Sequence, residues 1–193
     1  MGKERAPASP DIGMSIRSIV AAVAVLAGLV GETRAASLQQ LSTTEMIRSA
    51  TAIVRATVTG SSASQTGSTI YTHYKLQVSE NLKGQSPAQV DVPGGQANGL
   101  RQAFPGVPEL KQGTEYVLFI WTSSTGINHI LGFSQGVFSA AAQTDGSVHI
   151  ARARIAETMH DKLGNLVQDQ PVATTLSQLR TQVQSVLASG VTR

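Results

Sequence analysis

The clearest hydrophobic pattern in the chain is an alternation over residues 70–78. Mostly apolar side chains occupy every second position and polar side chains lie between them, a period of two that predicts a strand with one buried face. Residues 115–122 are instead apolar almost without a break, which predicts a strand buried on both faces. The side chains expected to be buried in these two strands are Tyr74, Leu76, Val78, Val117, Phe119 and Trp121.

Shorter segments with strand composition, separated by turn residues, make up much of the remaining chain. Residues 60–68 are rich in Ser, Gly and Thr and predict a loop, and Asp145-Gly146 is a strong hairpin signal. About six strands at short intervals favour an all-β barrel or sandwich with one helix at each end. The further strands are expected at 52–59, 89–92, 127–133, 136–142 and 148–151.

Two helices are expected, one on each side of the strand region. Ser42 and Glu45 can form a capping box, in which each side chain accepts from the other residue's backbone N–H, and this predicts a short helix over residues 43–50. Near the C-terminus, Pro171 precedes apolar residues at helical spacing, which predicts a helix over residues 173–188. Its apolar positions are Leu176, Leu179, Val183, Val186 and Leu187.

Residues 1–35 have the pattern of a secretory signal peptide. Arg17 precedes an apolar run over residues 19–30, and small side chains follow, so the mature chain is expected to begin near Ala36 as a single β-barrel domain over 36–190. The polar stretch before Met14 is long for such a signal, so Met14 is a second candidate for the start of translation. The apolar run is shorter than the roughly 20 residues that span a bilayer, and no later segment is longer.

Composition narrows the class of protein further. The chain has no cysteine, so an exported form has no disulfides and no thiolate metal site. This suits a bacterial protein that is secreted or periplasmic. The formal net charge is +3 without any run of Lys or Arg, so nucleic acid is not an expected partner.

One motif raises the question of catalysis. Residues 132–136 match the G-x-S-x-G pattern of serine hydrolases, with Ser134 as the nucleophile. That motif requires a helix directly after the serine, but here the chain turns at Asp145-Gly146 after a short segment of strand composition. A β-hairpin in which Gly132 and Gly136 allow close packing is therefore the favoured interpretation.

The remaining candidates for chemistry are weak. The four histidines, His73, His129, His149 and His160, show no helical metal-site spacing, and His73 is interpreted as an exposed polar residue. The acidic residues are scattered singly, and no glycine-rich phosphate loop precedes a helix. No catalytic residue, metal site or cofactor is therefore expected.

Several segments together resemble a set of uncharacterised exported bacterial proteins. These segments are MIRSATAIVRATV (46–58), IYTHYKLQVSENLKG (70–84), VPGG (92–95), PGVPELKQGTEYVLFI (105–120) and GFSQGVF (132–138). The pattern, over about residues 43–140, is also similar to the netrin-like module of tissue inhibitors of metalloproteinases, which is an OB-type barrel. The expected fold is therefore mostly β: an OB-like closed or partly open barrel of five to six strands, with short flanking helices and a C-terminal helix.

One departure limits what this resemblance implies about function. Those inhibitors hold the protease zinc through an N-terminal cysteine and carry disulfides, whereas this chain has no cysteine. We expect an exported, non-catalytic binding module whose ligand is not identified and whose partner is another exported protein, such as a protease. The alternatives are a small serine hydrolase that uses Ser134 and a protease-associated inhibitor or accessory domain.

The binding residues are expected in a long loop over residues 93–113. This stretch holds three of the seven prolines and five glycines, and long loops on a rigid scaffold are where binding residues concentrate. Arg101, Phe104 and Leu110 stand there in an otherwise polar setting, and aromatic and Arg side chains dominate interface energetics. These three residues are the predicted partner-binding set.

Overall fold

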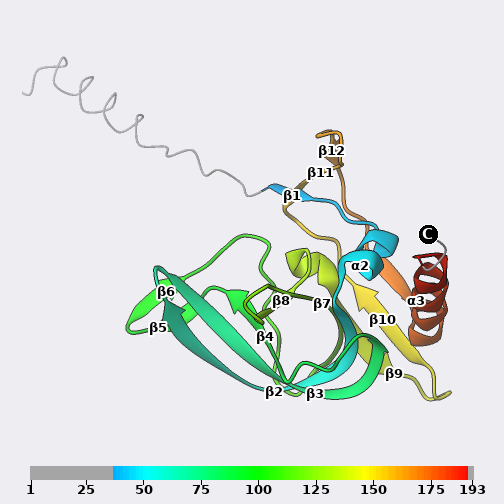
Figure 1. Cartoon of the computed structure of the whole chain (residues 1–193), viewed down its shortest axis with the longest axis horizontal. Coiled ribbons are helices and arrows are strands. Elements are labelled where there is room, and N and C mark those ends of the chain that lie inside the picture. The colour runs from blue at the N-terminus through cyan, green and yellow to red at the C-terminus, as the bar shows by residue number, and fades with distance from the viewer. Residues whose placement is uncertain (1–36, 191–193) are drawn as a thin grey trace, which may run out of the picture. The chain divides into compact units, whose positions relative to one another are not determined.

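The computed structural model describes residues 37–190, which form a mostly β structure with a C-terminal helix (Figure 1). The expected fold class is confirmed at this level. The signal peptide expected over residues 1–35 lies outside the described residues. Within residues 37–190, no helix combines the length and the apolar character needed to cross a membrane.

Eight strands form the main sheet. They are β2 (Ala52–Thr66), β3 (Thr69–Lys83), β4 (Gln89–Pro93), β7 (Glu115–Thr122), β8 (Asn128–Ile130), β9 (Val137–Ala142), β10 (Val148–Arg152) and β13 (Val172–Thr175). Their order in the sheet is β13-β10-β9-β7-β2-β3-β4-β8, and β7 also pairs with β8. The five strands β7, β2, β3, β4 and β8 therefore close into a ring, in which only the β4–β8 pair is parallel.

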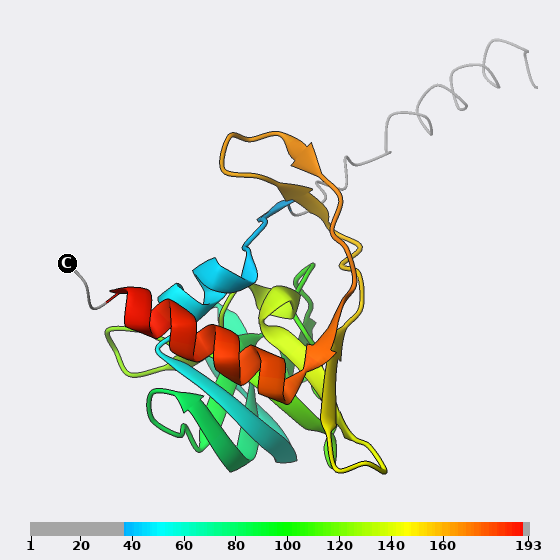
Figure 2. The same cartoon turned by 90° about the vertical axis from the view of Figure 1, so that its right-hand side faces the viewer.

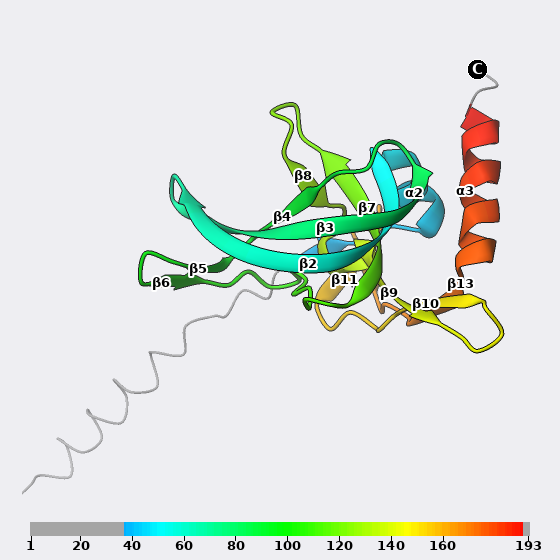
Figure 3. The ribbon, with the colours of Figure 1, turned by 90° about the horizontal axis from the view of Figure 1, so that it is seen from below.

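Strands β2 and β3 form a long, curved hairpin of 15 residues each (Figure 3). The loop expected over residues 60–68 is wrong, because β2 continues until Thr66 pairs with Thr69 and only Gly67 and Ser68 turn the chain. Strand formation depends on the partner that tertiary structure provides, so a Ser- and Gly-rich composition misplaced this boundary. Three register shifts interrupt the pairing, and such irregularities bend and twist a strand pair.

The interior of the ring is filled by apolar side chains that alternate along its strands. Tyr74 and Leu76 of β3 are buried as predicted, Val78 is partly buried beside them, and Leu118 and Ile120 of β7 have no exposed surface. The period of two in the sequence therefore identified the inward face of β3 correctly.

Two helices pack on the outside of β7. Helix α2 (Thr43–Ser49) begins with the predicted capping box between Ser42 and Glu45. Its last turn is held by Lys83, whose Nζ donates to two carbonyls, a favourable place for a cation. Helix α3 (Leu176–Gly190) starts later than the predicted residue 173 because residues 172–175 form β13. Figure 2 shows α3 lying across the sheet beside α2.

A second apolar core lies between β7 and the two helices. It explains why the predicted burial is correct for two residues of β7 and wrong for a third. Val117 and Phe119 point toward the helices and are fully buried. Phe119 packs against Phe138 of β9, with ring centroids 5.7 Å apart. Trp121 was expected to be buried as well, but it is 45% exposed. It follows Phe119 by two residues on the same face and lies outside the cluster that the helices cover.

The loop expected over residues 93–113 is only partly irregular. It contains a hairpin formed by β5 (Gly95–Ala97) and β6 (Leu100–Gln102). The hairpin packs closely on the β2–β3 pair, because a Cβ on Gly95 would lie 2.4 Å from Thr72 Oγ1. A separate small sheet joins β1 (Ser37–Gln39), β11 (Thr158–His160) and β12 (Leu166–Val167).

We predict that Phe119→Ala lowers the free energy of unfolding by about 3–5 kcal/mol, because it leaves a cavity in the core between β7 and the helices. Urea denaturation measures this loss. The control is Leu163→Ala, whose side chain is 87% exposed and whose effect should stay within about 0.5 kcal/mol. Equal effects of the two substitutions would contradict the assignment of Phe119 to a core.

Candidate functional site

A cavity of about 380 Å³ lies between the β2–β3 hairpin and the segment that carries β5 and β6. Arg101, Phe104 and Leu110, the three residues predicted from the sequence, all line it. Ser61 and Tyr74 contribute to the opposite wall from the hairpin strands. The structure thus brings the predicted residues together around one hollow, although they come from different parts of the segment.

The three residues differ in what they offer to a partner. Phe104 is 43% exposed and Arg101 is exposed, and no salt bridge of the described residues involves Arg101. Leu110 is only 4% exposed and belongs to the core inside the ring. Leu110 therefore supports the cavity from below, and Arg101 and Phe104 remain as the exposed anchors.

The segment is held firmly against the hairpin by its own side chains. Gln102 accepts from the backbone N–H of Ile70 at 2.7 Å and donates to the carbonyl of Ser68 at 2.7 Å. The hydroxyl of Thr72 donates to the carbonyl of Gly94 at 2.8 Å. Binding residues held by such contacts lose little conformational entropy when a partner arrives.

Tyr74 adds a polar group to the wall of the cavity. Burial raises the pKa of its phenol above the ordinary value, so the hydroxyl stays protonated at neutral pH. Glu109 is exposed at the same cavity. With Arg101 it gives the rim one charge of each sign, so the cavity suits a segment with an apolar group and a few polar contacts better than a polyanion.

Ser134 lies in a short 3-10 turn, η1 (Phe133–Gly136), and not in the β-hairpin that the sequence favoured. Its hydroxyl donates to the carbonyl of Gly106 at 2.8 Å, and its backbone N–H donates to the same oxygen. The strand β9, not a helix, follows the turn. The geometry that a nucleophile elbow needs is therefore absent at this serine.

The two glycines of this motif are needed for the conformation and the close packing of the turn. Gly132 has a φ of 65°, a backbone region that favours glycine. A Cβ on Gly136 would lie 2.3 Å from the carbonyl oxygen of Leu131, so no larger residue fits there. The G-x-S-x-G pattern thus encodes a tight turn at the ring and has no catalytic geometry.

A second group of polar residues, centred on His73, was not predicted from the sequence to form contacts with one another. His73 was interpreted as an exposed polar residue, but its side chain is only 21% exposed and has polar contacts with Asp91, Ser64 and Gln89. Its Nδ1 lies 2.8 Å from Asp91 Oδ1 and its Nε2 lies 2.7 Å from Ser64 Oγ. The alternation in β3 places His73 on the outer face, but only the pairing of β2, β3 and β4 brings its partners to it.

The order of these contacts, serine to histidine to aspartate, is that of a catalytic relay. Catalysis also needs a cavity for the substrate and donors for the developing oxyanion. Ser64 is exposed on an open strand face, and none of the cavities described in this section is lined by Ser64 or His73. The contacts fix the orientation of the imidazole and do not by themselves make an active site.

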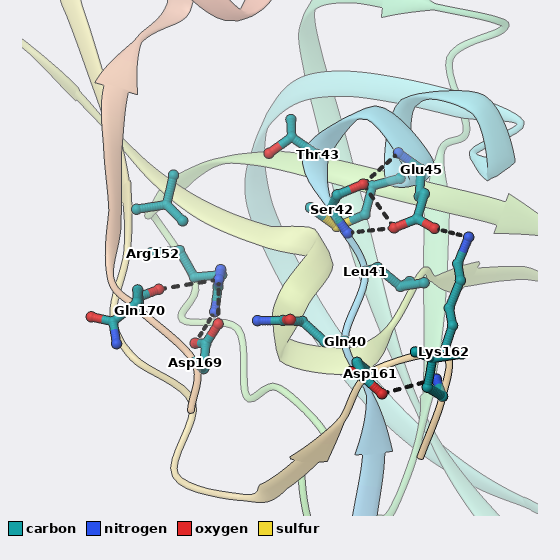
Figure 4. A pocket seen from close by; sticks show the side chains of 13 residues that line it. Gln40, Leu41, Ser42, Thr43, Glu45, Arg152, Asp161, Lys162, Asp169 and Gln170 are labelled. Carbon is teal, nitrogen blue, oxygen red and sulfur yellow. Dashed lines mark hydrogen bonds and ion pairs between the residues drawn. The ribbon is translucent and has the colours of Figure 1, made fainter. Parts of the chain in front are cut away.

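Another cavity, of about 650 Å³, is bordered by two ion pairs (Figure 4). Arg152 donates to both carboxylate oxygens of Asp169, at 2.6 and 2.9 Å. Burial alone would raise the pKa of Asp169, but the hydrogen bonds and charge of Arg152, together with the backbone N–H of Ile155, outweigh it and lower this pKa. On the opposite border Lys162 pairs with Glu45. Within each pair the two charges neutralise each other, and the pairs tie Lys162 to helix α2 and Asp169 to strand β10.

Within residues 37–190, no group of three or more His, Asp or Glu side chains is arranged to hold a metal ion.

We predict that a fluorophosphonate probe does not label Ser134, because the Ser134 hydroxyl donates a hydrogen bond to a backbone carbonyl. Mass spectrometry of the treated protein tests this. Ser134→Ala should retain partner binding, and a covalent adduct on Ser134 would contradict the structural assignment of the motif.

We predict that Glu45 contributes stability that is lost in acid. Hydrogen bonds from Lys162 and Ser42 lower its pKa from 4.5 to about 2. The folded state therefore binds fewer protons than the unfolded state between these values, and its stability falls as the pH falls through this window. Glu45→Gln should cost about 1 kcal/mol at pH 7, since Lys162 is largely exposed.

The difference between wild type and Glu45→Gln should vanish as the pH approaches 2, which urea denaturation across this range measures. The control is Glu157→Gln, because Glu157 forms no ion pair within the described residues. A difference that stays constant from pH 7 to pH 2 would show that the Glu45 carboxylate charge is not responsible.

The segments on which the netrin-like resemblance was based lie mainly in the ring strands β2, β3, β4 and β7, and they also include part of α2, the chain just before β7 and the turn η1. No protein-family model matches the chain, and no curated protein matches it either. The resemblance to the netrin-like module therefore stays a prediction. A function for this chain has to follow from the contacts, burial and charges of its own residues.

Proposed function

We propose that this chain is an exported, non-catalytic module that binds another exported protein. The observation that carries the proposal is the cavity at which Arg101 and Phe104 stand exposed on a firmly held segment. Aromatic and Arg side chains beside a pocket are the residues that most often dominate binding energy at interfaces. A protein segment that inserts an apolar side chain and offers an acceptor to Arg101 fits this chemistry.

We further propose that the ring is an OB-like barrel. An OB-fold is a five-stranded, partly open Greek-key barrel, and the order β2-β3-β4-β8-β7 with one parallel pair supports this assignment. Such a barrel supplies a rigid frame from which a connecting segment, here the one between β4 and β7, can present binding residues.

Export to the periplasm or the medium is part of the same proposal. It is supported by the signal-peptide pattern of residues 1–35 and by the lack of any cysteine. An exported protease is a partner of the proposed kind, because the netrin-like resemblance points to protease association. Inhibition through an N-terminal cysteine is not proposed, since the chain has none.

We predict that Arg101→Ala and Phe104→Ala each weaken capture of the partner by tenfold or more, because truncation of a central aromatic or Arg anchor typically costs about 2 kcal/mol or more. The measurement is affinity capture from secreted and periplasmic proteins of the producing cell, followed by mass spectrometry. Both side chains are exposed, so thermal unfolding should be unchanged.

Matched controls are Arg154→Ala and Leu163→Ala, which remove an exposed Arg and an exposed apolar side chain away from the cavity. A protein that is retained by wild type and both controls but lost by both cavity variants supports the proposal. Retention of the same protein by all four variants would exclude the cavity as the binding site.

A further inference from the structure

Five directly paired residues form a row across the ring. They are Trp121 in β7, His129 in β8, Asp91 in β4, His73 in β3 and Ser62 in β2. Side chains of directly paired residues stand on the same face of a sheet. Several of their sequence neighbours, including Tyr74, Val90 and Ile120, belong to the core inside the ring, so the row faces outward.

The middle of the row is a hydrogen-bonded network with free atoms at its surface. Asp91 Oδ1 lies 2.8 Å from His73 Nδ1 and accepts from Gln89 Nε2 at 2.7 Å. His129 Nδ1 lies 3.3 Å from the backbone carbonyl oxygen of Asp91. Among the described residues, no hydrogen bond occupies Asp91 Oδ2, Gln89 Oε1 or His129 Nε2. The row therefore offers two oxygen acceptors and one ring nitrogen that can form hydrogen bonds with a ligand.

The end of the row is an aromatic surface. The indole of Trp121 is 45% exposed and stacks on the imidazole of His129, with centroids 5.8 Å apart and planes at 24°. The ring of Tyr71 also lies near His129, at 6.4 Å between ring centroids. An exposed indole that is held in place by a stacked neighbour is a surface on which a ring of a ligand can pack.

The charges of the row decide between classes of ligand. Asp91 carries the only carboxylate of the row. Lys75 of β3, which is paired with Gln89 of β4, is the one Lys or Arg that the strand pairing places beside the row. A nucleic-acid strand needs several cations along its phosphates, and this face does not provide them. An uncharged ligand with ring faces and many hydroxyl groups can stack on Trp121 and donate to the free oxygens.

We propose that this row is a second binding site, separate from the cavity at Arg101, and that its ligand is a neutral oligosaccharide. From Trp121 to His73 the row crosses three strand spacings, about 14 Å along the sheet. That length accommodates several sugar rings end to end. The oriented His73 and Asp91 side chains then select hydroxyl positions, and Trp121 supplies most of the apolar contact.

The chain offers a direct readout, because Trp121 is its only tryptophan. Tryptophan fluorescence, excited at a wavelength that the three tyrosines do not absorb, therefore reports on this row alone. Titration with cellotetraose, maltotetraose and chitotetraose should give a saturable change in emission with at least one of them. An oligothymidine of twelve nucleotides should give none.

Variants tested by calorimetry with the sugar that binds show which residues hold it. Trp121→Ala should weaken binding by at least about tenfold, as expected for loss of a stacking platform. Asp91→Asn, which keeps the shape but removes the charge, should weaken it as well. The controls Leu163→Ala and Arg101→Ala should bind the sugar like wild type, and thermal unfolding of each variant checks its fold.

Three results would overturn the proposal. The first is the absence of a saturable change with all three tetrasaccharides at millimolar concentration. The second is a Trp121-dependent response to the oligonucleotide in their place. The third is sugar binding that survives Trp121→Ala in a folded protein. Partner capture at the cavity is measured separately, so its loss or retention does not affect this conclusion.

Discussion

Strand β7 is the element on which both cores and the ring depend. One of its edges pairs with β2 from Ala52 to Thr57. The other edge pairs first with β9 and then, beyond Leu118, with β8. The exchange takes place at Phe119, whose carbonyl accepts from Leu131. Because a buried backbone group without a partner is costly, the change of partner has to be completed within this short space.

The turn η1 makes that exchange possible. It joins β8 to β9, and its Gly136 lies so close to the carbonyls of Leu131 and Phe119 that a Cβ would collide with the first of them. Ser134, in the same turn, ties the 93–113 segment to the ring through Gly106. A motif that looks catalytic in the sequence therefore closes the ring and anchors the segment that carries the cavity.

The two proposed binding surfaces use different properties of the ring. The cavity depends on a connecting segment, which Gln102 and Thr72 hold against the β2–β3 hairpin. The outer row depends on strand register alone, because each of its members is paired directly with the next. A chain without disulfides keeps both surfaces in place through backbone pairing and two apolar cores.

The sequence by itself determined the features that depend on neighbouring residues. The alternation in β3, the capping box at Ser42 and Glu45, and the turn at Asp145-Gly146 all follow from local chemistry and are present in the structure. It also placed Arg101 and Phe104 in a segment that the structure leaves exposed. Only tertiary structure decided the length of β2, since residues 60–66 become a strand by pairing with β3.

The exposure of Trp121 and the burial of Leu110 were likewise decided by packing between distant elements. An apolar run does not reveal where its covering helices stop, so Trp121 was misplaced. The contacts of His73 with Ser64 and Asp91 join three strands. No local pattern specifies them, because strand register is set by the whole hydrophobic surface and by the bulges that shift it.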